Sequence, residues 1–517
     1  MAKTSARIYL AALFAFGAGS AAFATDPLSA IEWLEKRPKQ VVVPLTKPDK
    51  VVIDEPPVAG SITTPEVTVT PLGAPVRAAA GLLPSNVTGL PRQLWVQSDA
   101  DSVATLLTAL KVDAQPALQS LLYTLLLAEA DPPSDERDAS FMRARVKKLF
   151  ELGAVDPASA LLDRSDPAHV DLFDLYFDVA LLNGDAAQPC AALSKDPALS
   201  RDLARRIYCD VQSENWDSAA LTLSTADAIG ALNAIDVTLL ERFLDPELFE
   251  DVLIPAPPAR PSVLQFRLFE AIGEALPTTA LPRAFAATDL TGDAGWKPQL
   301  EAAERLARVG AISENRLLGI YSSRIPSASG GIWDRVEAIQ RLETALNAGD
   351  PVAVLKQTRR AWTQMENAGL QIPFATLFAQ GLMRLPSAGA DADLVTRIAL
   401  LSPLYEQAAS RETSDPALKS AQAVATGEPV SGGPHALSNA ITAAFDSSNA
   451  PQFLSDMAKE GQLGEAILRA MSLAATGATG DPGALQSGLA FLRSVGLEDT
   501  VRRTALQLLL IEGRDQG

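Results

Sequence analysis

The chain has 517 residues, of which 47% are hydrophobic, 21% charged and 6% aromatic, a composition typical of globular proteins. This composition excludes a wholly disordered chain, a collagen and a multi-span membrane protein. The formal net charge is −18 at pH 7, and no basic stripe with interleaved aromatic residues occurs, so we expect no nucleic acid partner.

Residues 1–24 have the three parts of a secretory signal peptide. Lys3 and Arg7 give a basic start, an apolar run follows over 8–16, and small residues lead to a cleavage site between Ala24 and Thr25. Glycine and serine dilute the run before it reaches the roughly 20 residues that a membrane anchor needs. We expect the signal to be cleaved and the mature chain, without an integral membrane segment, to be periplasmic.

Residues 25–97 are expected to form an N-terminal arm. It begins with a short amphipathic helix carrying Trp33, and a Pro/Val-rich segment follows, with ten prolines between Pro38 and Pro91. Proline fixes φ and lacks an amide donor, which favours an extended backbone here. Trp33 either packs back on the body or docks in a partner's groove.

From Ser98 onward the apolar spacing becomes helical. Leu118, Leu121, Leu122 and Leu125, for example, recur at i, i+3, i+4 and i+7. Asp-Pro also recurs, and each copy is interpreted as a helix start, because Asp accepts from free amides and Pro fits the first helical position. The nine copies begin at Asp26, Asp131, Asp156, Asp166, Asp196, Asp245, Asp350, Asp415 and Asp481. Together these signals predict an all-α body.

Short connections between the predicted helices favour antiparallel neighbours. A long row of such hairpins predicts a tetratricopeptide-like solenoid, although no clean 34-residue period aligns. Two breaks, at the prolines of 255–261 and at 427–434, divide the body into helical blocks 98–254, 255–426 and 427–517. Alternatively, the breaks are elbows within one superhelix.

Cys190 and Cys209 are the only cysteines, which suits one disulfide in an oxidising compartment. They lie on either side of Asp196-Pro197, so the bond would join two successive helices. The alternative is a metal or redox role, but the chain has no Cys-x-x-Cys, and two thiols alone do not complete a zinc site.

Three aspartates, Asp171, Asp174 and Asp178, fall on one side of a predicted helix. Carboxylates gathered in this way could bind a hard cation such as calcium. The alternative interpretation is a solvated acidic face.

A Ser-Gly-Gly turn over 329–331 separates a predicted helix that carries Tyr321 from one that carries Trp333 and Arg335. It would bring aromatic and guanidinium groups close together, which indicates a weak candidate binding site. Ordinary turn chemistry explains the glycines equally well.

Motifs for catalysis and cofactors are missing from the sequence. The two histidines, His169 and His435, lie in different predicted blocks, and no Gly-x-Ser-x-Gly, phosphate loop or His-Glu-x-x-His occurs. We therefore expect no catalytic residues and no cofactor.

Three segments carry a family resemblance: 81–95, 276–279 and 329–334, the last of which reads Ser-Gly-Gly-Ile-Trp-Asp. The chain resembles a group of exported bacterial α-helical proteins, some of which are named antifreeze glycopeptide polyprotein. The resemblance implies the envelope of a Gram-negative bacterium as the setting, and it implies no mechanism. Ala-Ala-Thr is only scattered along the chain, so we expect no repeating ice-binding surface.

A stack of helical hairpins predicts a long concave surface that binds extended segments without bond chemistry. We therefore expect a periplasmic scaffold or adaptor whose partner is an envelope protein or a peptide. Two alternatives stay open: a carboxylate-dependent enzyme that processes cell-wall glycans, and a soluble periplasmic carrier. Turnover of cell-wall fragments would favour the enzyme, and a small molecule that survives purification would favour the carrier.

Overall fold

The computed structural model describes residues 79–136, 139–248, 253–291, 294–429, 436–445 and 450–511. Contacts divide the chain into two units, Met1–Pro71 and Leu72–Gly517, and every described residue belongs to the second. The signal peptide, its cleavage site between Ala24 and Thr25, and Trp33 lie outside the described residues, so the expectations about them stay predictions.

The all-α prediction is confirmed: over the described ranges the regular structure is helical, apart from one isolated β-bridge between Leu83 and Ala128. The tetratricopeptide-like arrangement stays a prediction. In these ranges the helices are α2 (Ser85–Thr88), α3 (Ala100–Ala109), α4 (Pro116–Leu127), α5 (Ser140–Glu151), α6 (Val155–Asp163), α7 (Val170–Leu182), α8 (Ala187–Lys195), η1 (Pro197–Leu199), α9 (Leu203–Gln212), α10 (Trp216–Ala228), α11 (Ala234–Leu244), α12 (Val263–Ala271), η2 (Thr278–Ala280), η3 (Arg283–Thr291), α13 (Trp296–Ala307), α14 (Glu314–Ser322), α15 (Ile332–Ala348), α16 (Pro351–Glu366), α17 (Gln371–Met383), α18 (Ala390–Leu400), α19 (Tyr405–Ala408), α20 (Pro416–Thr426), α21 (Ala436–Ala444), α22 (Gln452–Lys459), α23 (Leu463–Ala478), α24 (Pro482–Ser494) and α25 (Glu498–Leu510).

Most of the described Asp-Pro copies mark helix starts, and half of them cap the helix. Asp350, Asp415 and Asp481 cap α16, α20 and α24, and Asp196 caps the 3-10 helix η1. A fifth copy, Asp156, also marks a helix start, because it lies in the first turn of α6 without capping it. The prediction is wrong for the other three: Asp131 and Asp166 lie in loops, and Asp245 follows α11. The dipeptide fixes only a local turn, and a neighbour can cap instead, as His169 does for α7.

The folded body begins before Ser98, so the predicted arm is wrong in its last part, residues 79–97. Leu94 and Trp95 are buried, and the N–H groups of Leu82 and Leu83 both donate to Leu127 O at the end of α4. A side chain at Gly81 would lie 2.5 Å from Ala128 O, so the two backbone segments approach each other closely.

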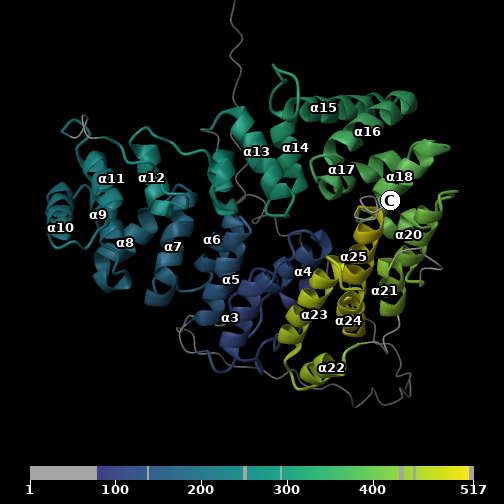
Figure 1. The fold of residues 1–517 in the computed structure, drawn as a ribbon, viewed down its shortest axis with the longest axis horizontal. Helices are drawn as coiled ribbons and strands as arrows, with labels where there is room; N and C mark the ends of the chain where they lie inside the picture. Colours follow the sequence, from purple (N-terminus) through teal and green to yellow (C-terminus); the bar gives the residue numbers. More distant parts are fainter. Residues whose placement is uncertain are drawn as a thin grey trace, which may run out of the picture. The chain divides into compact units, whose positions relative to one another are not determined.

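Helices α5 to α12 each pack on their neighbour in the chain, and α12 also packs on α7 (Figure 1, left). The proline segment 255–261 lies between α11 and α12, and these two helices are in contact. The helices that flank the second predicted break, at 427–434, both pack on the C-terminal helices: α20 contacts α25, and α21 contacts α24. Both predicted boundaries therefore lie inside one compact unit.

The last helices of the chain pack against the first helices of the body. In Figure 1, α23 and α25 lie beside α4, and α23 also contacts α3. Gly464 N–H donates to Leu94 O at 2.9 Å, and a side chain at Gly464 would lie 2.4 Å from the Trp95 ring. The Gln507 Oε1 atom of α25 accepts from Ala117 N–H at 2.9 Å, although 390 residues separate the two.

These contacts give α4 the N-terminal cap that its own sequence lacks. Gln115, the residue at the cap position, makes no side-chain capping bond, so Gln507 satisfies one of the free amides of the first turn. Leu506, Leu508 and Leu510 of α25 are buried, which fixes the helix in place. Among the described helices, none is both long and apolar enough to cross a membrane.

Candidate functional site

A cavity of about 450 Å³ lies where sequence-distant helices meet. Its walls are α4, the turn from α13 to α14, α17 and α25, together with Pro403. The cavity therefore depends on the packing of the C-terminal helix against α4.

The α4 wall carries polar atoms without partners. Gln119 is only 2% exposed, and its Oε1 and Nε2, together with the Tyr123 hydroxyl, make no hydrogen bond to any described residue. The two residues lie one turn apart on α4 and both line the cavity. These atoms are enclosed by the protein, and a buried polar atom without a partner costs about 1–3 kcal/mol.

Burial raises the pKa of the Tyr123 hydroxyl well above its ordinary value, and the charge of Arg283 opposes this only in part. The neighbouring Gln119 side chain also lowers that pKa in part. The hydroxyl is therefore neutral at physiological pH and able to donate a hydrogen bond as well as accept one.

The charged groups on the α25 wall bond to each other and to Tyr405 of α19. Asp499 Oδ1 accepts from Arg503 Nε at 3.0 Å and from the Tyr405 hydroxyl at 2.9 Å. The Arg503 guanidinium also lies 5.5 Å from the centre of the Tyr405 ring. Burial, and then the hydrogen bond to Asp499, raise the pKa of Tyr405 to about 12. The charges on this wall thus already have partners.

The turn from α13 to α14 forms the third wall. Gly310 has φ +65°, a left-handed conformation, and a side chain there would lie 3.6 Å from the Tyr123 ring. Arg308 Nε donates to Ala368 O at 2.5 Å, which ties the turn to the segment that leads into α17. Glu314, in the first turn of α14, also lines the cavity.

The structure brings the predicted binding residues Tyr321, Trp333 and Arg335 into one region, around a fourth residue, Glu304. Glu304 accepts from the Tyr321 hydroxyl at 2.8 Å, and Arg335 binds both of its oxygens, at 2.6 and 2.7 Å. Burial alone would lower the pKa of Arg335, but the hydrogen bonds and charge of Glu304 raise it above its usual value. Tyr321 is 1% exposed, so this network packs the core.

A second, more open cavity of about 550 Å³ lies beside this network and is lined by Trp333 and Arg335. Trp333 packs on Trp296 with ring centres 5.3 Å apart. Arg305, also in the lining, donates to the carbonyls of Thr278 and Leu281. The binding role of these residues stays a prediction, and the first cavity is the stronger candidate because it is the more enclosed of the two.

The predicted cation ligands do not converge. Asp174 and Asp178 both pair with Arg205, whereas the Asp171 carboxylate lies 3.2 Å from His169 Nδ1. In the part of the chain that the structure describes, no three His, Cys, Asp or Glu side chains are grouped to hold a metal ion. A guanidinium thus occupies the position that a cation would take between Asp174 and Asp178.

Asp178 is predicted to make stability pH-dependent. Burial raises its pKa from 3.8 to about 6, with Arg205 opposing and Asp174 reinforcing the rise. The folded state therefore binds the proton more tightly than the unfolded state, and this contribution to stability is lost as the pH rises through about 6. The Asp178→Asn variant has no proton to lose at this position. Its free energy of unfolding should therefore rise relative to that of the wild type by about 1–2 kcal/mol between pH 4 and pH 7.

Urea titrations of both proteins at each pH would check this prediction. The comparison isolates Asp178 from the other carboxylates, which titrate in both proteins. A difference between the two proteins that stays constant from pH 4 to pH 7 would contradict the raised pKa.

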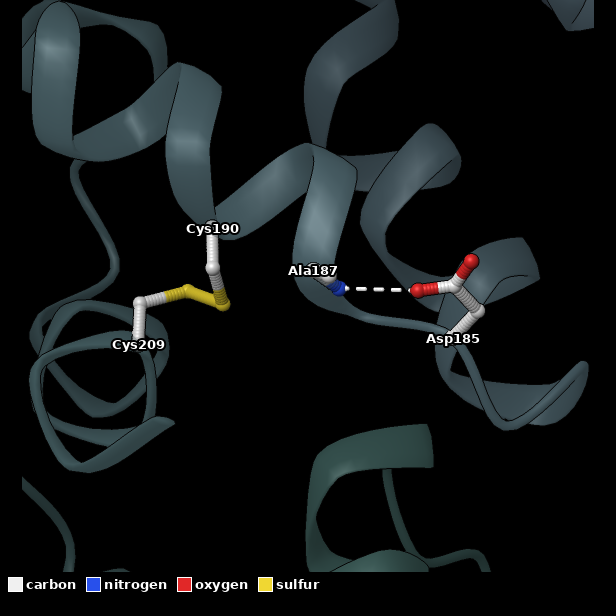
Figure 2. Close-up of a disulfide and its surroundings, with 4 residues drawn as sticks. All are labelled: Asp185, Ala187, Cys190 and Cys209. Atoms are coloured by element: carbon white, nitrogen blue, oxygen red, sulfur yellow. Dashed lines mark hydrogen bonds between the residues drawn. A yellow bond between two sulfur atoms is a disulfide. The ribbon is translucent and has the colours of Figure 1, made fainter. Parts of the chain in front are cut away.

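Cys190 and Cys209 are joined by a disulfide, as the sequence predicts, with their sulfurs 2.02 Å apart. Figure 2 shows the bond linking α8 to α9 and, nearby, the Asp185 carboxylate accepting from Ala187 N–H at 3.1 Å. The bond therefore joins two successive helices of the row that runs from α5 to α12.

No family model matches the chain, and the searches of curated proteins and of solved structures find no match. Three residues important to the two cavities were missed from the sequence: Gln119, Tyr123 and Glu304. Gln119 and Glu304 are polar residues at buried positions of otherwise apolar helix faces, a signal that could have singled them out, whereas Tyr123 is only half-buried.

Proposed function

We propose that the chain is an exported helical scaffold or adaptor that binds a segment of another envelope protein, or a peptide, without making or breaking bonds. The observation that carries this proposal is the enclosed cavity between α4, α17 and α25, which is lined by both polar and apolar side chains. A preformed cavity with a few polar groups suits recognition of a ligand without chemistry.

The charges that line this cavity also support binding of a neutral segment. Two cations, Arg308 and Arg503, are balanced by two anions, Glu314 and Asp499. A volume of about 450 Å³ lies within the roughly 300–1,000 Å³ of small-ligand sites, so the cavity suits a short segment rather than a folded domain.

Photo-cross-linking in intact cells tests this function. A diazirine amino acid at Ser120, an exposed residue of the cavity lining, should capture one reproducible envelope protein through a single segment of it. The matched control carries the same group at Ala228, an exposed residue at the end of α10, and should not capture that protein. No capture from Ser120, or equal capture from both positions, would rule out the adaptor function at this cavity.

A carboxylate-dependent glycan-processing enzyme is the second candidate, because Glu314 and Asp499 line the same cavity. Its test is turnover of purified cell-wall fragments by the mature protein. Turnover that Glu314→Gln or Asp499→Asn abolishes would favour the enzyme over the adaptor.

A further inference from the structure

We propose that the open cavity of about 550 Å³ between α13 and the start of α15 binds a small organic anion. The carboxylate or phosphate oxygens of this anion would face Arg305 and Lys297, and its ring or apolar part would lie on Trp333. The site shares only Arg308 with the lining of the cavity between α4, α17 and α25. The proposal therefore goes beyond the proposed function and does not depend on it.

The lining of this second cavity is positively charged, in contrast to the chain as a whole. It carries four cations and two anions, a net charge of +2, whereas the whole chain has a net charge of −18. The cations are Lys297, Arg305, Arg308 and Arg335, and the anions are Glu301 and Glu304. Positive charge gathered in a hollow raises the local concentration of small anions.

The two glutamates of the lining already have cationic partners. Glu304 binds Arg335 through both oxygens, at 2.6 and 2.7 Å, and also accepts from Arg308 at 3.3 Å. Glu301 pairs with Lys297 at 2.9 Å. Because Lys297 is 57% exposed, its ammonium can also reach a bound anion.

Arg305 is the cation of the lining that has no carboxylate partner among the described residues. Its two terminal nitrogens donate to Thr278 O at 2.9 Å and to Leu281 O at 2.6 Å. These bonds hold the guanidinium in the cavity wall and use only two of its five N–H groups. Burial, and then the charges of Arg283 and Arg308, lower the pKa of Arg305. An anion in the cavity would offset the repulsion among these cations.

Trp333 gives the cavity an aromatic surface beside the cations. Its ring packs on that of Trp296, with the ring centres 5.3 Å apart, and Trp296 Nε1 donates to Ile320 O at 3.0 Å. Trp296 is buried and holds Trp333 in place, whereas Trp333 itself is only partly buried. A fixed aromatic ring binds a flat apolar group at low entropic cost. The site therefore suits an anion that carries a ring.

Fluorine NMR of the full mature protein, labelled with 5-fluorotryptophan, tests the proposal. The anionic probe is N-acetylphenylalanine, and the neutral probe is N-acetylphenylalaninamide, which has nearly the same shape without the charge. Loss of one resonance in Trp333→Phe assigns the signal of Trp333. We expect the acid to shift that signal and to bind about tenfold more tightly than the amide. Phenyl phosphate is the third probe, and its affinity relative to the acid shows which oxyanion the site prefers.

Lys297→Glu gives a second, independent readout. Reversal of this exposed charge removes the net positive charge of the lining, so binding of the acid should weaken about tenfold and binding of the amide should not change. Lys419→Glu is the matched control, because Lys419 is also exposed in the first turn of a helix, α20. It changes the net charge of the protein equally and should change neither affinity.

Several results would overturn the proposal. They are equal binding of the acid and the amide, binding of neither anion, a shift confined to tryptophans other than Trp333, or unchanged affinity for the acid in Lys297→Glu. The adaptor function has its own test at Ser120, so it would stand or fall separately.

Discussion

Replacing Arg145 by methionine is expected to lower the free energy of unfolding by about 3–5 kcal/mol. Arg145 is 1% exposed, and its guanidinium donates to Leu126 O and Ala80 O at 2.8 Å and to Ala128 O at 3.0 Å. Burial lowers its pKa to about 10, with Glu136 opposing, so the group stays charged at neutral pH. Methionine fills much of the space but leaves three buried carbonyls without this donor.

Urea unfolding of the mature protein measures this loss. Arg143→Met is the matched control, because Arg143 lies on the same helix, α5, but is exposed, and the change there should stay within about 0.5 kcal/mol. Arg145→Lys should recover only part of the stability, since one ammonium cannot replace the planar fork of the guanidinium. An Arg145→Met protein as stable as the control would refute the role assigned to this residue.

Removal of the disulfide is expected to cost about 3 kcal/mol in the chain-entropy model, because the bond closes a loop between residues 19 apart in sequence. The double variant Cys190→Ala/Cys209→Ala should therefore unfold at lower urea than the wild type. Hydrogen exchange should quicken most in α8 and α9, the two helices that the bond joins (Figure 2).

The reducing agent provides the control for this second prediction. Dithiothreitol should bring the wild type close to the double variant and should leave the variant itself unchanged. Equal urea midpoints for oxidised wild type and double variant would show that the bond contributes little to stability.

Local patterns in the sequence predicted the helices well. Leu118, Leu121, Leu122 and Leu125, which recur at helical spacing, are all buried on α4 as expected. The disulfide was also predictable, since the chain has only two cysteines and they flank one helix start. Asp-Pro was less informative, because it sets a turn without fixing where the next helix begins.

The packing of α25 on α4 could not be predicted from these patterns. The contact from Ala117 to Gln507 spans 390 residues and leaves no periodic signal in either helix. The same holds for residues 79–97, whose prolines suggested an extended arm although Trp95 packs against Gly464. Proline limits the local backbone conformation, but it does not prevent a segment from being buried against distant helices.

The candidate site was missed for a related reason. Gln119 lies in a leucine-rich helix, and whether it lines a cavity depends on which distant helices pack against α4. By contrast, the aromatic and guanidinium groups at Tyr321, Trp333 and Arg335 are close in sequence, and their proximity followed from one turn. Their partner Glu304 comes from another helix, and its bonds to Tyr321 and Arg335 make the group part of the core.

Hydrogen exchange of the mature protein, with and without the partner segment captured at Ser120, tests the central claim most directly. The claim is that α4, α17 and α25 together form one binding site. It predicts that the segment slows exchange in 116–127, 371–383 and 498–510 together, and leaves α8 to α11 unchanged. Slowed exchange in only one of the three helices, or in the α8 to α11 row instead, would contradict it.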